Sequence, residues 1–198
     1  KNIYFVQVDV SASSTTQNAY LPYTAGILVA SAFKSKIVRE NCTFKKFIFL
    51  REDVDSVVSG MDHPSFVGFS SYCWSTEYNK LLAKKIKEKY PDCLIVFGGH
   101  DVPDNFDMLA EYPFIDVLCH GEGEDTVREL LEAYCTNESF ENVSNISFRF
   151  SDNQYKRTQT KLQTTLEYPS PYLEGWFDAI IAEYPEITFN AILETSRG

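Results

Sequence analysis

Short apolar runs alternate with amphipathic stretches along the first 136 residues of the chain. The runs are rich in β-branched and aromatic residues and are apolar on both faces, which is typical of buried strands. The stretches between them repeat their apolar residues every three or four positions, as surface helices do. The predicted strands are residues 3–10, 44–50, 66–71, 93–97 and 115–119, and the predicted helices are residues 22–35, 53–60, 76–90 and 125–134.

This alternation predicts an α/β fold with a doubly wound, five-stranded parallel sheet, and we assign it to a domain of residues 1–136. Right-handed crossovers bring the loops that follow the strands to one edge, where open sheets bind ligands. The pattern weakens afterwards, and residues 137–198 are predicted to form a small extension. It comprises a hairpin (143–150 and 155–162), a proline-rich linker (168–172), a short helix (176–183) and a strand (188–194).

The charge balance excludes several classes of partner. The 198 residues include 28 Asp and Glu against 18 Lys and Arg, which gives a net charge of −10. Without a basic patch, such a chain binds neither nucleic acid nor an anionic membrane. The longest apolar-rich stretch, residues 21–33, is too short to span a bilayer. The five cysteines lack the spacing of metal ligands, and their odd number without a secretion signal predicts a cytoplasmic protein.

Four segments at the expected ligand edge have unusual compositions. Residues 10–33 contain no charge in a chain that is 23% charged, so the hydroxyl-rich loop 11–18 either faces a neutral ligand or merely precedes a buried helix. Residues 68–75 end in hydroxyls and two aromatic rings, which either suit a planar ligand or cover the sheet edge. Glycines occur in pairs at 98–99 and flank Glu122 at 121–123. Such glycines allow the backbone to approach a ligand closely, although the acidic residues also suit a helix start.

No catalytic arrangement is recognisable in the sequence. A phosphate-binding loop, a dinucleotide fingerprint and a carboxylate cluster after the first strand are all missing, and three histidines in unrelated loops form no triad. A flavodoxin-type loop is conceivable at residues 13–16, although it lacks glycine. We therefore predict a binding module with no catalytic residue and no metal ligand of its own.

The order of these segments resembles the N-terminal cobalamin-binding domain of cobalamin-dependent radical SAM enzymes. Those enzymes include methyltransferases and anaerobic magnesium-protoporphyrin monomethyl ester cyclases. The resemblance rests on residues 67–70 (VGFS), 95–99 (IVFGG), 115–117 (IDV) and 120–124 (HGEGE), and on the helix start after residues 21–22 (LP). Residues 192–198 (ILETSRG) resemble the strand that leads into the cluster motif of radical SAM proteins. We therefore expect the chain to be an N-terminal piece of a longer enzyme.

The resemblance implies a flavodoxin-like (Rossmann-like) fold that holds cobalamin across the strand-end loops. The chain's partner would be its own radical SAM domain, with a [4Fe-4S] cluster and S-adenosylmethionine, and that domain would choose the small-molecule substrate. The cobalt would carry the transferred group. The implied cofactor-binding residues, with the glycine pair 98–99 nearest the cofactor's tail, are Ser11, Ser13, Tyr20, Leu21, Pro22, Ser70, Ser71, Tyr72, Gly98, Gly99, His100, Gly121, Glu122 and Gly123.

Two departures and two alternatives accompany this resemblance. His120 stands where the family usually has arginine, and the Asp-x-His-x-x-Gly motif that supplies a histidine ligand in other cobalamin enzymes is absent. One alternative is a degenerate domain that folds alike, holds no corrinoid and serves as a scaffold for the radical SAM domain. The other is an independent flavin carrier. Corrinoid binding requires a hollow at the strand-end edge that the protein's own bulky side chains do not fill.

Overall fold

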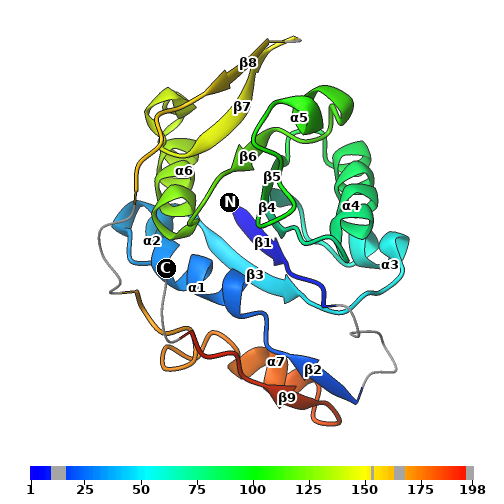
Figure 1. The fold of residues 1–198 in the computed structure, drawn as a ribbon. Coiled ribbons are helices and arrows are strands. Elements are labelled where there is room, and N and C mark those ends of the chain that lie inside the picture. The colour runs from blue at the N-terminus through cyan, green and yellow to red at the C-terminus, as the bar shows by residue number, and fades with distance from the viewer. Residues whose placement is uncertain (10–16, 153, 163–167, 195–198) are drawn as a thin grey trace.

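A seven-stranded sheet forms the centre of the protein (Figure 1). The computed structural model describes residues 1–9, 17–152, 154–162 and 168–194. Within them the strand order is β3-β1-β4-β5-β6-β7-β8. The parallel strands are β1 (Asn2–Val6), β3 (Thr43–Ile48), β4 (Pro64–Ser70), β5 (Leu94–Gly98) and β6 (Val117–Cys119).

The parallel part of the sheet confirms the doubly wound fold. Its first strand, β1, lies between β3 and β4, which is the flavodoxin-like order. The five predicted parallel strands are present, but the sheet has seven strands in all, because the hairpin predicted as a separate extension continues the same sheet. β7 (Ile146–Ser151) pairs antiparallel with β6 and is followed by β8 (Gln154–Arg157). The hairpin thereby covers the edge of β6 that would otherwise be unpaired.

Helices cover both faces of the sheet and produce two cores. α1 (Tyr23–Ala32), α2 (Lys36–Asn41) and α6 (Glu124–Thr136) pack on the face that presents Phe5, Phe66 and Val96. The other face is covered by α3 (Val54–Ser59), α4 (Thr76–Lys89) and α5 (Asp107–Glu111). The predicted helix 22–35 ends at Ala32, and α2 begins anew after Ser35, whose side chain accepts a hydrogen bond from the Val38 amide at 3.4 Å.

The last part of the chain returns to the first helix. After the 3-10 turn η1 (Phe140–Asn142) and the hairpin come α7 (Asp178–Glu183) and β9 (Thr188–Asn190). β9 pairs in parallel with β2 (Asn18–Tyr20), a short strand that the sequence did not reveal, and Figure 1 shows this pair beside α7, outside α1. Within the described ranges, no helix is long and apolar enough to cross a membrane.

Candidate functional site

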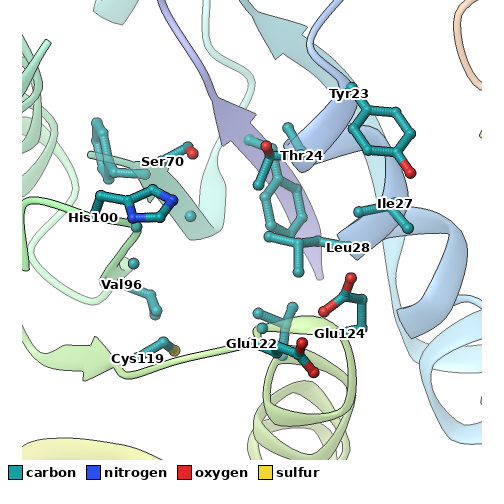
Figure 2. Close-up of a pocket in the computed structure, with 18 of the residues that line it drawn as sticks. Tyr23, Thr24, Ile27, Leu28, Ser70, Val96, His100, Cys119, Glu122 and Glu124 are labelled. Carbon is teal, nitrogen blue, oxygen red and sulfur yellow. The ribbon is translucent and has the colours of Figure 1, made fainter. Parts of the chain in front are cut away.

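A cavity of about 840 Å³ lies at the carboxyl ends of β4, β5 and β6, between the sheet and helices α1 and α6. This volume is in the range of small-molecule sites. Figure 2 shows side chains of α1 on one side of the hollow and side chains of the sheet and its loops on the other; below them lie Glu122, just before α6, and Glu124, its first residue. The labelled α1 residues are Tyr23, Thr24, Ile27 and Leu28, and those opposite are Ser70, Val96, His100 and Cys119.

The cavity exists because side chains on this face of the sheet become smaller toward the carboxyl ends. Alternate residues of a strand share a face, so Phe66, Gly68 and Ser70 of β4 point to the same side. In β5 the corresponding series includes Val96 and Gly98, which lie beside Gly68 and Ser70 in the register. Bulky residues therefore fill the deep part of this layer, and small ones leave room near the strand ends.

Helix α1 is positioned over this space by polar and apolar contacts. Its start lacks a side-chain cap, and the Oε1 atom of Gln7, just beyond β1, accepts the Ala25 amide hydrogen at 2.8 Å. The Thr24 hydroxyl lies 3.4 Å from the Tyr72 hydroxyl, so a polar contact joins α1 to the loop after β4. Together these contacts fix one wall of the cavity.

Ser70 and Ser71, both expected at the ligand, have different surroundings. Ser70 lines the cavity and is 7% exposed, and its Oγ has no hydrogen-bond partner among the described residues. Ser71 is fully buried and does not line the cavity; its Oγ accepts a hydrogen bond from Asn79 Nδ2 at 3.2 Å. A buried hydroxyl without a partner is uncommon in proteins, and a ligand in the cavity could provide one.

Gly98 and Gly99 both line the cavity, but only one of them must be glycine. Gly99 has φ +108°, and a Cβ atom there would lie 2.6 Å from the carbonyl oxygen of Ser71. A Cβ on Gly98 would lie 3.5 Å from that of Cys119, which is ordinary contact. A glycine at 99 was expected so that a ligand could approach the backbone. The structure gives a different reason, because the Ser71 carbonyl of the protein itself lies where a side chain at 99 would begin.

Aromatic rings form a flat surface at the rim. Tyr72 stacks on Trp74 with ring centroids 4.8 Å apart and an interplanar angle of 2°. His100 lies against the same tyrosine at 5.5 Å. Tyr72 and His100 line the cavity, whereas Trp74 is 43% exposed beside it. We call these three residues the aromatic rim.

The loop before α6 and the first residue of that helix also line the cavity. Gly121, Glu122 and Gly123 line it, as does Glu124, which is only 3% exposed. Burial raises the pKa of the Cys119 thiol to about 12, so this lining residue stays neutral. No group of three or more His, Cys, Asp and Glu side chains suited to a metal ion occurs in the part of the chain that the structure describes.

Some expected residues lie away from the cavity. Tyr20 belongs to β2 and pairs with Asn190, and Leu21 is buried in the core. Neither they nor Pro22 are lining residues, whereas the next turns of the chain, in α1, are. Ser11 and Ser13 fall outside the described residues. His120, the departure from the family pattern, points elsewhere: its Nε2 lies 2.8 Å from Ser147 Oγ in β7.

The end of the described chain also borders the cavity, which the sequence did not indicate. Ile192, Leu193 and Glu194 are lining residues. The Ile192 amide donates to the Tyr172 hydroxyl at 3.0 Å, and that hydroxyl donates to the Ile192 carbonyl at 2.8 Å. Tyr172 in turn stacks on Tyr23 at 5.8 Å. This placement depends on the pairing of β2 with β9, which no local pattern reveals.

Comparison with known proteins gives two methyltransferases that match most of the chain and a cyclase that matches a shorter part, the anaerobic magnesium-protoporphyrin IX monomethyl ester cyclase of Synechocystis sp., 37% identical over 92 residues, which are 46% of this chain and 18% of the cyclase. No family model matches the chain. It is 34% identical over 184 residues, 90% of its length, to the 2-(S-pantetheinyl)-carbapenam-3-carboxylate methyltransferase of Streptantibioticus cattleyicolor. It is 32% identical over 203 residues, 100% of its length, to the cobalamin-dependent radical SAM methyltransferase TokK of Streptomyces tokunonensis. These matches cover 27% and 29% of the two relatives, so the chain spans less than a third of their length.

A solved structure has the same fold. The cobalamin-dependent S-adenosylmethionine radical enzyme OxsB, with aqua-cobalamin and S-adenosylmethionine bound, matches 100% of this chain and 27% of its own with a TM-score of 0.71. The sequence identity is 19%, so this likeness concerns the fold alone.

Proposed function

The chain is homologous to the N-terminal part of cobalamin-dependent radical SAM methyltransferases, and we propose that it is the part of such an enzyme that binds the corrinoid. The observation that carries the proposal is the cavity at the carboxyl ends of β4, β5 and β6. Open α/β sheets bind their ligands at this edge, and here it is not filled by side chains.

The residues around the cavity fit the chemistry of a corrinoid. Cobalamin has a wide, mostly neutral ring with amide side chains and a long tail. Amide groups need hydrogen-bond donors and acceptors, which Ser70, Thr24 and the carboxylates of Glu122 and Glu124 supply. The cavity would receive the tail, and the aromatic rim would offer a flat surface to the ring. The site therefore meets the requirement for corrinoid binding that its hollow is not filled by the protein's own large side chains.

In this proposal the chain holds and orients the cofactor and carries no catalytic residue. When bound, the corrinoid supplies a cobalt ion that carries the transferred group. The radical SAM domain, with its [4Fe-4S] cluster and S-adenosylmethionine, acts on the small-molecule substrate in the same cytoplasmic enzyme. Residues 137–198 connect the two parts. They suit this role, because the hairpin extends the sheet and the segment that follows leads Ile192–Glu194 to the cavity.

The cavity also argues against a degenerate scaffold. A domain that had lost its ligand would be more stable with this space filled, since a void forfeits packing contacts. The small residues Ser70 and Gly98 keep it open at the strand ends instead. The scaffold and the flavin carrier remain as outcomes that one experiment separates.

The experiment is reconstitution followed by desalting. We expect the purified chain, mixed with hydroxocobalamin, to keep corrin absorbance after gel filtration. Thr24→Trp places a large ring at the cavity wall and should abolish retention. The matched control is Leu81→Trp. Leu81 is 50% exposed and belongs to α4, which covers the face of the sheet away from the cavity, so this variant should retain the cofactor. Circular dichroism checks that both variants fold.

Other outcomes overturn the proposal. A wild-type protein that elutes colourless, with native circular dichroism, indicates the scaffold. A protein that stays colourless with hydroxocobalamin but elutes yellow with flavin mononucleotide indicates the flavin carrier.

A further inference from the structure

Two cysteines that are far apart in the sequence meet in the structure. Cys42 Sγ lies 3.2 Å from Cys135 Sγ, although 93 residues separate them. Cys42 follows α2 as its C-cap, and Cys135 lies in the last turn of α6. The sulfur atoms of a disulfide are about 2.05 Å apart, so a shift of about 1 Å would join these two.

The two thiols differ in how a reagent can reach them. Cys42 is 8% exposed, whereas Cys135 is half-buried and therefore the more accessible of the two. Burial raises the pKa of Cys42 to about 12, with a further contribution from its contact with Cys135. Cys42 is therefore protonated and shielded at neutral pH, which leaves Cys135 as the thiol that a dissolved reagent meets first.

We propose that Cys42 and Cys135 form a redox-active dithiol that closes to an intramolecular disulfide when it reacts with a low-molecular-weight disulfide. The Cys135 thiolate attacks one sulfur of the oxidant and forms a mixed disulfide with it. The S–S bond of the oxidant breaks, and its other half leaves as a thiolate. Cys42 then loses its proton and attacks the sulfur of Cys135, which releases the half bound there. The two protein thiols give up two protons and two electrons, and the oxidant is reduced to two thiols.

The closed form joins parts of the fold that are remote from the cavity. The bridge would tie the start of β3, the edge strand of the sheet, to the end of α6. Glu124, the cavity residue at the other end of that helix, is eleven positions away, or about 16 Å along the axis. The inference thus goes beyond the proposed function and does not depend on it. A cross-link over so long a loop restricts the unfolded chain and raises stability.

The test uses oxidised glutathione on the variant Cys73→Ser, because Cys73 is exposed and would react on its own. After removal of the reagent, titration of thiols in denaturant should show a loss of two thiols per chain. Mass spectrometry of a non-reduced digest should join the peptides of Cys42 and Cys135. The melting temperature should rise by several degrees and return to its first value with dithiothreitol.

The matched control is the double variant Cys73→Ser/Cys135→Ser, in which neither the thiol count nor the melting temperature should change. Unchanged thiols in Cys73→Ser, a lasting glutathione adduct on Cys135, or a bridge to Cys93 or Cys119 would each overturn the proposal. If the double variant folds poorly, the peptide map of Cys73→Ser decides alone.

Discussion

At the scale of single residues, Ser70 and Ser71 are neighbours in the sequence with different surroundings, one at the cavity and the other in a buried hydrogen-bond network. Ser71 is fully buried and bonded to Asn79, whereas Ser70 faces the cavity with no partner for its hydroxyl among the described residues. The sequence places both residues at the end of the same strand but does not distinguish them, because their difference depends on which face of the sheet meets α1. We therefore expect Ser70 to matter for cofactor affinity and Ser71 to matter for the stability of the fold.

Ser70→Ala should weaken corrinoid binding without destabilising the protein. Loss of one hydrogen bond lowers affinity by about 3- to 10-fold, or about 1 kcal/mol. In the absence of ligand, removal of an unpaired buried hydroxyl should leave the free energy of unfolding unchanged or raise it. Cofactor titration and urea denaturation measure the two effects. Ser71→Ala is the control and should lower the free energy of unfolding by about 1 kcal/mol; equal stability losses in both variants would contradict the assignment.

Gly99→Ala should destabilise the fold, unlike Gly98→Ala. The new Cβ would lie 2.6 Å from the Ser71 carbonyl oxygen in a backbone conformation that disfavours side chains. We expect a loss of about 2–4 kcal/mol in the free energy of unfolding. Gly98→Ala should change it by less than about 1 kcal/mol. Denaturant titration compares the free energies of unfolding of the two variants. Equal losses would show that the Ser71 carbonyl is not what requires glycine at position 99. Because Gly99→Ala harms the fold, it cannot serve as a test of cofactor contact.

At the scale of elements, α1 shows why its role was only partly predictable. Seven of its residues are buried, and they face α6, the cavity and the returning C-terminal segment. A helix that is apolar nearly all round gives no periodicity from which to choose a ligand face. The uncharged stretch 10–33 therefore indicated the right region, while the lining residues lie in α1 rather than at Tyr20–Pro22.

Gly26→Val should loosen the C-terminal segment from α1. A Cβ at Gly26 would lie 2.8 Å from Phe177 Cε1 and 3.1 Å from Pro171 Cβ, so a valine cannot fit without moving both. We expect the free energy of unfolding to fall by about 1–3 kcal/mol and proteolysis within residues 168–190 to become faster. Gly60→Ala, whose Cβ meets nothing closer than 3.6 Å, is the control and should behave as wild type. Unchanged proteolysis in Gly26→Val would contradict this packing.

His120, directly after β6, should make the free energy of unfolding depend on pH. Burial lowers its pKa below the ordinary value of 6.5, and Arg157 contributes in the same direction. As pH falls below about 6.5, the unfolded chain binds this proton first, so the free energy of unfolding decreases toward and through the folded pKa. Urea denaturation at pH 7.5 and 5.5 should therefore show a larger decrease in wild type than in His120→Gln. An equal decrease in both would exclude His120 as a cause.

At the scale of the whole molecule, local patterns predicted the parallel sheet and its helices, but not the long-range contacts. Apolar runs and amphipathic repeats can be recognised because they involve residues that are close together in the sequence. The pairing of β2 with β9, the addition of β7 to β6 and the contact of Cys42 with Cys135 join residues whose partners no local rule specifies. The strand-end glycines and Ser70 were predictable because they lie at the ends of apolar strands or directly after them. The wall formed by Ile192–Glu194 was not.

The central claim is that the hollow between α1, α6 and the sheet receives part of a corrinoid. Its most direct test is a crystal structure of the chain grown with hydroxocobalamin. The account predicts density for the cofactor's tail inside the cavity, with an atom within hydrogen-bond distance of Ser70 Oγ, and for the ring against Tyr72 and Trp74. Density for the cofactor elsewhere on the surface, with only solvent between α1 and α6, would contradict it.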